Sequence, residues 1–448
     1  MGDVQVREQC GKECPETLEV DAQGLELYCR DNGENSLVII VEAVVDHDVD
    51  ARALDEAVRM AEECFDAFEC ALASSGHGLV YRRLTSPARA YGDVTGRRWR
   101  LGTDETNGRL YRVTDDGPRI TVSLHHGLTD GRGAFEYLKT LLYYYLKACG
   151  HDVDGEGKVH VAGEAICAKD AYPYETYGTA REREASQGTG SPSLFGIPED
   201  YLDEHGEYKC RHVELALPVA AVLSRAHGAH VTVTSLLVAA VDRAIGATYG
   251  VGDEMVMTCV TCDLRPVFES STLRNFSGWT VLAETAPMRA LDIDTEAQVL
   301  AGQLVSVRDR EVALAGIGDR LATAVRLKEA PVDGFFGNEG ARMVEKRGVR
   351  SRLSCMVTNV GVVDLPADIA RHVRKASFRI PSFNATMTVS IATCCETLTM
   401  NVTQPFVSLG FASALTHMLA DLGLEARMVD HGLEAYDVLG RDAVCDLA

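Results

Sequence analysis

The hydrophobic pattern near the start of the chain changes from one typical of a strand to one typical of a helix. Residues 36–45 (SLVIIVEAVV) are rich in β-branched side chains, which favour a strand. Beyond a candidate N-cap at Asp48 or Asp50, apolar residues recur at helical spacing as far as Leu72, which predicts a helix. Shorter strands are predicted at 79–82, 98–101, 109–113 and 119–124.

The same alternation returns after a break. Residues 134–146 place apolar side chains on one face of a helix, whereas from about 150 to 209 the periodicity is lost among Gly, Ser, Pro and mixed charges. Further strands are predicted at 210–217, 255–262, 279–284, 353–359, 385–393 and 398–403. We therefore expect an α/β (α+β) fold in two lobes, each a mixed sheet with flanking helices. The predicted segments are an N-terminal extension (1–35), an N-terminal lobe (36–150), a crossover linker (151–209) and a C-terminal lobe (210–448).

The segment with the most chemistry, HHGLTDG at 125–131, lies between a predicted strand and a predicted helix. Adjacent histidines project in opposite directions from a strand, so only one of His125 and His126 can face a given cleft. Asp130 is placed to pair with a buried cation, and Gly131 has the backbone freedom to turn the chain into the helix. A lone histidine is more often structural than catalytic. The full H-H-x-x-x-D-G spacing, however, arises by chance in only roughly a few per thousand such sequences, which favours a catalytic site.

Composition and charge narrow the class of protein. The chain has 448 residues, of which 46% are hydrophobic and 25% charged, which predicts a globular soluble protein. With 66 acidic and 44 basic residues the formal net charge is -22, which argues against nucleic acid and anionic membrane surfaces as partners. The apolar stretches fall short of the roughly 20 residues that a membrane-spanning helix needs. The charged N-terminus lacks the apolar region of a signal peptide, so we expect a cytoplasmic protein.

The cysteines favour packing over metal binding. Cys259 and Cys262 form a C-x-x-C among the 14 cysteines, but they lie in a predicted strand, where side chains three apart face opposite sides. No second pair or nearby histidine completes a ligand set, so we predict no metal site. A chain with this many unpaired thiols fits a reducing cytoplasm.

The histidine motif resembles that of the CoA-dependent acyltransferases and the nonribosomal-peptide condensation domains, which share the chloramphenicol-acetyltransferase-like fold. The closest resemblance is to free-standing bacterial alcohol acyltransferases and polyketide-associated acyltransferases. Two further stretches resemble regions of this family in the expected order: TCDLRP at 261–266 followed by LRNFSG at 273–278, and MVTNVGVVDLP at 356–366. The D-F-G-W-G of the plant branch is absent, and PSFNAT at 381–386 occupies roughly that region.

The resemblance implies a tunnel between the two lobes, with an acyl thioester entering from one face and the nucleophile from the other. His126 would be the general base and His125 structural, while Asp130 and Arg265 would form a buried ion pair that shapes the loop beside Gly131. Asn359 and Ser390 are candidates for stabilising the oxyanion or orienting the substrate.

Three functions are compatible with this sequence. In the first, acyl-CoA is a co-substrate and His126 takes a proton from an alcohol or amine acceptor in a ternary complex, because no Ser or Cys lies in a nucleophile elbow. In the second, a carrier protein acting in trans supplies the acyl group on a phosphopantetheine thioester. In the third, the chain is a non-catalytic relative that binds an acyl ligand or a protein. Carrier proteins tend to be acidic and a chain of net charge -22 would repel them, which favours CoA.

Overall fold

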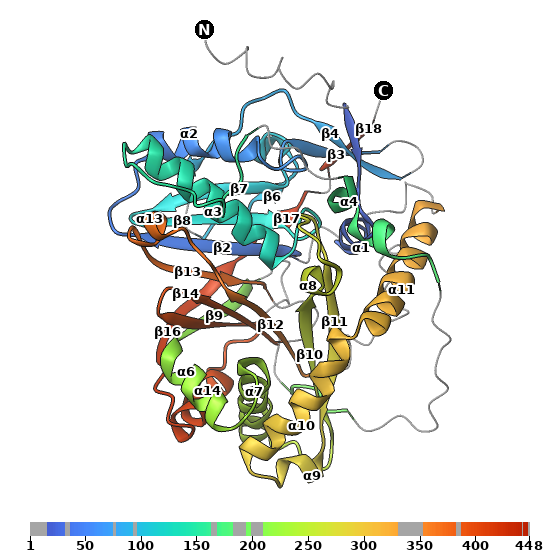
Figure 1. The fold of residues 1–448 in the computed structure, drawn as a ribbon, viewed down its shortest axis with the longest axis vertical. Helices are drawn as coiled ribbons and strands as arrows, with labels where there is room; N and C mark the ends of the chain where they lie inside the picture. The colour runs from blue at the N-terminus through green and yellow to red at the C-terminus, as the bar shows by residue number, and fades with distance from the viewer. Residues whose placement is uncertain are drawn as a thin grey trace.

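The computed structural model describes residues 16–31, 36–74, 78–92, 96–162, 168–181, 194–198, 209–329, 353–381, 387–440 and 442–446. Within them the chain forms two lobes, each with mixed sheets and helices (Figure 1), as the sequence predicted. The N-terminal lobe contains a five-stranded sheet (order β13-β2-β8-β7-β5) and a four-stranded sheet (order β1-β4-β3-β18). The C-terminal lobe contains a seven-stranded sheet (order β11-β10-β12-β14-β15-β9-β16).

The strands of the N-terminal lobe are β1 (Thr17–Glu19), β2 (Val38–Val45), β3 (Cys70–Ser74), β4 (Leu79–Arg83), β5 (Tyr91–Gly92), β6 (Arg100–Leu101), β7 (Tyr111–Asp116), β8 (Arg119–His125), β13 (Val373–Arg379), β17 (Val438–Leu439) and β18 (Val444–Asp446). Its helices are α1 (Ala22–Arg30), α2 (Ala51–Glu62), η2 (Asp104–Thr106), α3 (Gly131–Ala148), α4 (Ala168–Ala171), α5 (Pro173–Tyr177), α11 (Arg310–Glu329) and α13 (Ala367–Ala370).

The strands of the C-terminal lobe are β9 (Lys209–Pro218), β10 (Val256–Asp263), β11 (Ser277–Glu284), β12 (Cys355–Val362), β14 (Met387–Cys394), β15 (Thr397–Gln404) and β16 (Arg427–Ala435). Its helices are α6 (Val219–Gly228), α7 (Val233–Tyr249), α8 (Arg265–Phe268), α9 (Ala286–Arg289), α10 (Ile293–Val305), η3 (Ser306–Arg308) and α14 (Gly410–Asp421).

Helix α2 shows where local pattern and tertiary structure disagree. Its start is as predicted, because the Asp50 carboxylate accepts hydrogen bonds from the backbone N–H groups of Arg52 and Ala53. The predicted extension of this helix to Leu72 is wrong, since α2 ends at Glu62 and residues 70–74 form β3. The small and apolar residues of CALAS are compatible with the repeat of a helix and with that of a strand. Pairing with β4 and β18 makes this segment a strand.

The C-terminal half of the chain contributes strands to the sheets of the N-terminal lobe. β13, which belongs to the second half of the chain, pairs with β2 in the five-stranded sheet, and β18 near the C-terminus pairs with β3. Ion pairs add to this connection: Arg379 on β13 donates to Glu42 on β2 (2.8 Å) and to Glu434 on β16 (2.9 Å). The segment boundaries predicted at 150 and 210 therefore divide the sequence, whereas the five-stranded and four-stranded sheets of the N-terminal lobe draw on both halves. The seven-stranded sheet is formed by residues 209–435 alone.

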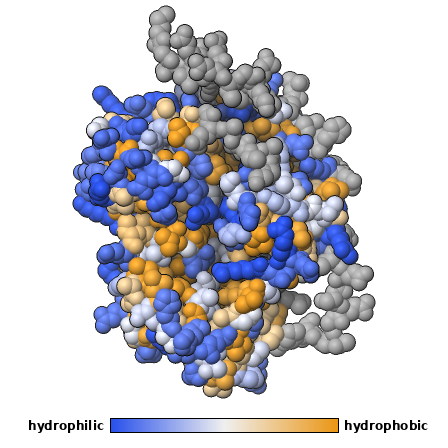
Figure 2. Space-filling view, viewed as in Figure 1, coloured by the Kyte–Doolittle hydropathy of each residue, from blue (hydrophilic) through white to orange (hydrophobic). Residues whose placement is uncertain are grey.

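The described residues on the visible surface differ between the lobes. Figure 2 shows hydrophilic residues gathered over the N-terminal lobe near α2 and α3, and more hydrophobic surface over the C-terminal lobe. No single helix of the described part is long and apolar enough to cross a membrane; α6 and α7 pass that test only as a pair bent by 91°.

Candidate active site

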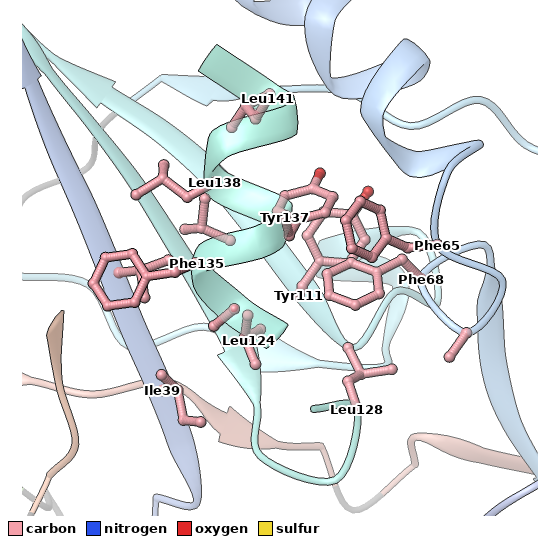
Figure 3. Packing of buried hydrophobic residues seen from close by; sticks show 14 of the residues in the cluster. Ile39, Phe65, Phe68, Tyr111, Leu124, Leu128, Phe135, Tyr137, Leu138 and Leu141 are labelled. Atoms are coloured by element: carbon pink, nitrogen blue, oxygen red, sulfur yellow. The ribbon is translucent and has the colours of Figure 1, made fainter. Parts of the chain in front are cut away.

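The histidine motif is fixed at both ends by secondary structure. β8 ends at His125, and α3 begins at Gly131, directly after its N-cap Asp130, whose Oδ1 accepts from the Gly133 N–H (3.1 Å). Between them Leu128 points into the core beside Leu124 and the aromatic rings around Tyr137 (Figure 3). The loop that carries His126 is therefore short, anchored by a buried leucine and capped at the start of a helix.

The hydrogen bonds of His126 leave one ring nitrogen available. Its Nδ1–H donates to the Thr129 carbonyl (3.1 Å), since a carbonyl can only accept, and this assigns the proton to Nδ1. Nε2 then carries the free lone pair, and none of the described residues hydrogen-bonds to it. The side chain is half-buried, and removal from water lowers the pKa of His126 from its ordinary value in spite of nearby Asp130. The imidazole is therefore neutral near pH 7 and can accept a proton at Nε2.

His125 is fully buried and has a different set of partners. Its Nδ1 accepts from the Gly127 N–H (2.9 Å), so its proton lies on Nε2, which donates to Asp31 Oδ2 (3.1 Å). Tyr28 stacks on the ring with centroids 4.6 Å apart. Asp31, which follows α1, was missed at the sequence level because it lies in the predicted N-terminal extension and carries no local motif.

Asp130 and Arg265 form the predicted buried ion pair. The guanidinium of Arg265 makes two parallel bonds, from Nη1 to Asp130 Oδ2 and from Nη2 to Asp130 Oδ1, both 3.0 Å. Its other N–H groups reach Asp263 Oδ1 and the carbonyls of Thr272 and Arg274, at 2.8–2.9 Å. All five donors of the side chain are thus used.

The charge of this pair is compensated on both sides. Burial alone would raise the pKa of Asp130, but Arg265 and the N–H groups of Phe276 and Gly133 hold the pKa below its ordinary value. Asp130 is therefore ionised, and it fastens the start of α3 to the segment around α8 in the C-terminal lobe.

Asn275 is a second residue for which sequence reasoning gave no role, although it lies in the LRNFSG stretch. Its side chain is fully buried, and its Nδ2 donates to the His126 carbonyl (2.8 Å) and to the Gly127 carbonyl (3.2 Å). The Tyr81 hydroxyl also donates to the Gly127 carbonyl (3.2 Å). Side chains from both lobes therefore hold the backbone directly after the catalytic candidate.

The glycines of the motif let neighbouring side chains pack against the backbone of the loop. The expectation that Gly131 uses unusual backbone angles is wrong, because neither it nor Gly127 nor Gly133 has a positive φ. A Cβ at Gly131 would lie 2.9 Å from Val360 Cγ1, and one at Gly127 would lie 2.3 Å from the ring of Tyr28. Glycine is needed because other elements pack directly on the loop.

The structure does not bring Asn359 and Ser390 together. Asn359 on β12 donates from Nδ2 to Thr234 Oγ1 of α7 (3.0 Å), so it points toward the helices of the C-terminal lobe. Ser390 on β14 pairs with Thr358, the neighbour of Asn359, and therefore lies on the opposite face of the sheet. Of the two candidates for orienting substrate, only Ser390 faces the N-terminal lobe.

Cys259 and Cys262 lie on β10, where their spacing places them on opposite faces. In the part of the chain that the structure describes, no group of three or more His, Cys, Asp or Glu side chains is arranged to hold a metal ion.

Comparison with known proteins finds solved structures of similar fold. No family model and no curated protein matches the sequence. TRI101 of Fusarium sporotrichioides, solved with coenzyme A and T-2, is similar with a TM-score of 0.59 at 12% identity, over 92% of this chain and 99% of that chain. TRI3 trichothecene 15-O-acetyltransferase of the same organism gives 0.58 at 9% identity, over 91% and 95%. The epimerization domain from the third module of tyrocidine synthetase B gives 0.57 at 14% identity, over 91% and 97%.

At these identities the likeness concerns the fold, and solved structures with this fold carry out different reactions. The chain therefore has the two-lobed chloramphenicol-acetyltransferase-like fold that its histidine motif predicted.

Proposed function

We propose that the protein is an acyltransferase that moves an acyl group from a CoA thioester to an alcohol or amine, with His126 as the general base. The observation that carries this is the arrangement of the His126 ring. Its Nδ1–H is bound to the Thr129 carbonyl, and on this half-buried, neutral imidazole no described residue binds the Nε2 lone pair.

In the reaction, His126 Nε2 takes the proton from the acceptor O–H or N–H as the oxygen or nitrogen attacks the thioester carbonyl carbon. The carbonyl electron pair moves to oxygen and forms a tetrahedral oxyanion, which hydrogen-bond donors in the site stabilise. Collapse of this intermediate breaks the C–S bond. The imidazolium then returns its proton to the leaving thiolate, so that the acyl product, free thiol and neutral His126 result.

Asp31, His125 and Asn275 position the base in this proposal. They hold the N–H of Gly127 and the carbonyls of His126 and Gly127, and the Asp130–Arg265 pair fixes the start of α3. Such supports matter because misplacement by about 1 Å can cost on the order of a hundredfold in rate.

CoA is favoured as the donor over a carrier-bound thioester. One protein with this fold was solved with CoA bound, and the net charge of -22 opposes an acidic carrier protein. The similarity to a peptide-synthetase domain keeps a carrier protein acting in trans as the second candidate. We assign the activity to the cytoplasm, where CoA is available and thiols stay reduced.

The test is release of free thiol from acetyl-, medium-chain and long-chain acyl-CoA in the presence of mixed alcohols and amines. We expect release by the wild type and a loss of at least about a hundredfold in His126→Ala, in the range found for general-base catalysis. His417→Ala, at an exposed position on α14, is the matched histidine control and should behave as wild type. No release from CoA esters but release from carrier-bound esters would establish the second candidate. No release from either would leave a binding role.

A further inference from the structure

The face of the seven-stranded sheet that Ser390 occupies carries a row of hydroxyl groups. Thr261 Oγ1 on β10 donates to Thr358 Oγ1 on β12 (2.9 Å), and Thr358 is in register with Ser390 on β14. Thr388 follows on the same face of β14. We call these four residues the hydroxyl row. At its outer end Thr261 pairs with Trp279 on the edge strand β11.

The hydroxyl row lies between the lobes. The opposite face of the same strands is apolar and packs with α7 and α14, in a core that includes Val357, Val389 and Ile391. On the face of the row, Asn401 is the next residue in register after Ser390, and its Nδ2 donates to the carbonyl of Phe378 on β13 (2.8 Å). The row therefore faces the five-stranded sheet of the N-terminal lobe.

The row continues to the loop that carries His126. Val360 follows Thr358 by two residues on β12, and it is the side chain against which Gly131 of the motif packs. At the edge of the sheet, two strands from β12, Phe276 directly precedes β11 and donates its N–H to Asp130 (2.9 Å). The motif thus rests on the ends of the strands whose surface bears the hydroxyl row.

Two hydroxyls of the row are buried without a hydrogen bond. Ser390 Oγ and Thr388 Oγ1 have no partner among the described residues, and both side chains are at most 1% exposed. A buried hydroxyl without a partner is costly, so such groups are expected to bind water or a ligand. Because they lie on the same face as Thr358, a single extended ligand could contact several of them.

Exposure falls steadily from the edge of the sheet inward. Trp279 is 52% exposed, Thr358 is 6% exposed and Ser390 is fully buried. Thr261, between the first two, is half-buried. A ligand approaching from the β11 edge would meet an indole ring first and hydroxyl groups afterwards.

We propose that the hydroxyl row and Trp279 form the acceptor subsite, and that it takes a hydroxyl-rich acceptor such as a glycoside or polyol. Hydroxyl groups both donate and accept, so the row matches a ligand that does the same. The indole ring offers an apolar platform whose polar edge stays in water. The assignment as an acceptor subsite rests on the proposed acyltransferase function.

The experiment uses Trp279 as the reporter. The chain has two tryptophans, so the full-length Trp99→Phe variant leaves Trp279 as the single source of indole fluorescence. Titration with octyl glucoside below its micelle-forming concentration is compared with titration with 1-octanol, which has the same tail without the sugar. We expect octyl glucoside to change the Trp279 emission at concentrations at least about tenfold lower than 1-octanol.

Variants of the row connect this signal to the hydroxyls. Thr358→Val and Ser390→Ala, each in the Trp99→Phe background, should weaken octyl glucoside binding about fivefold and leave 1-octanol binding unchanged. Thr416→Val on α14 removes a hydroxyl outside the row and should change neither. Equal affinity for the two ligands, or octyl glucoside binding that is insensitive to Thr358→Val and Ser390→Ala, overturns the subsite.

Thiol release, measured separately, distinguishes the two proposals. Row-dependent binding of octyl glucoside with no thiol release from any thioester overturns acyl transfer and leaves the hydroxyl row as a ligand site. Thiol release that needs His126 but no row-dependent binding overturns the subsite and leaves acyl transfer standing.

Discussion

Asp31 Oδ2 accepts a hydrogen bond from His125 Nε2 at 3.1 Å, across 94 positions of sequence. Because His125 Nδ1 accepts from Gly127, the bond to Asp31 fixes which nitrogen carries the proton. The residues before the first predicted strand are therefore part of the support of the motif. In the proposed function Asp31 is a positioning residue that acts through His125.

Replacing Asp31 tests this support. Asp31→Leu leaves the buried Nε2–H of His125 without that acceptor, and we expect the free energy of unfolding to fall by about 1–3 kcal/mol. The turnover number kcat should fall while the KM for acyl-CoA stays constant, since Asp31 acts through the loop and touches no substrate. Asp31→Asn keeps an acceptor oxygen and should retain most of the activity. Equal losses of kcat in the two variants would contradict the positioning role.

The pH dependence of activity should reflect the lowered pKa of His126. Burial lowers this pKa from 6.5, and the base works only in its neutral form, so activity is lost as the pH falls through a value below 6.5. The measurement is kcat/KM for acyl-CoA between pH 4.5 and 8.5, at fixed ionic strength. An acid limb with a midpoint above 6.5 would show that His126 is not the titrating base.

Replacing only one partner of the Asp130–Arg265 pair should lower the free energy of unfolding more than replacing both. Arg265→Met leaves Asp130 as a buried charge without its cation, and we expect a loss of about 3–5 kcal/mol in the free energy of unfolding. The double variant Arg265→Met with Asp130→Leu should recover part of that loss. Urea unfolding of wild type, Arg265→Met, Asp130→Leu and the double variant gives the coupling energy. Additive losses would mean that the two charges do not interact in the folded chain.

The glycines of the motif can be tested against a glycine of the same chain that has free space. Gly127→Ala places a methyl group within 2.3–2.6 Å of the Tyr28 ring, and we expect about 1–3 kcal/mol of destabilisation. Gly302→Ala on α10 meets no atom within 4 Å and should stabilise the helix by about 0.5–1 kcal/mol. Thermal unfolding of both variants checks the contrast, and equal shifts in Tm would contradict the close packing at Gly127.

Asp242 should make stability depend on pH in the C-terminal lobe. It is fully buried on α7, and desolvation raises its pKa well above the ordinary value although Thr258 donates a hydrogen bond to it. Between about pH 4 and the raised pKa the folded chain holds one more proton than the unfolded chain at this site. Each unit of rising pH in that window therefore lowers stability by about 1.4 kcal/mol.

Asp242→Asn keeps the shape of the side chain and removes this proton. Its stability relative to wild type should increase as the pH rises from 4.5 to 7.5, measured by urea unfolding at each pH. Asp253→Asn, at an exposed position, is the matched control. A difference between Asp242→Asn and wild type that does not change with pH would mean that Asp242 is ionised in the folded chain.

Much of the fold could be predicted from the sequence because its signals are local. β2 at 38–45 and α3 at 131–148 follow from the period of their apolar residues, and Asp50 caps α2 as expected. The position of the histidine motif between a strand and a helix was also predictable, since the strand and helix periods meet there. The end of α2 was not predictable, because the residues of β3 are compatible with both a helix and a strand. Pairing with β4 and β18 makes them a strand.

The sequence by itself determined the two-lobed α/β fold and the resemblance that singled out His126, since these depend on short-range order and a compact motif. Tertiary structure decided which side chains meet that motif. Asp31 accepts a hydrogen bond from His125, and Asn275 donates one to the His126 carbonyl. Val360 packs so closely on residue 131 that only glycine fits there. These contacts join distant parts of the chain and leave no periodic trace, because a side chain's partner across an interface is set by how sheets and helices pack.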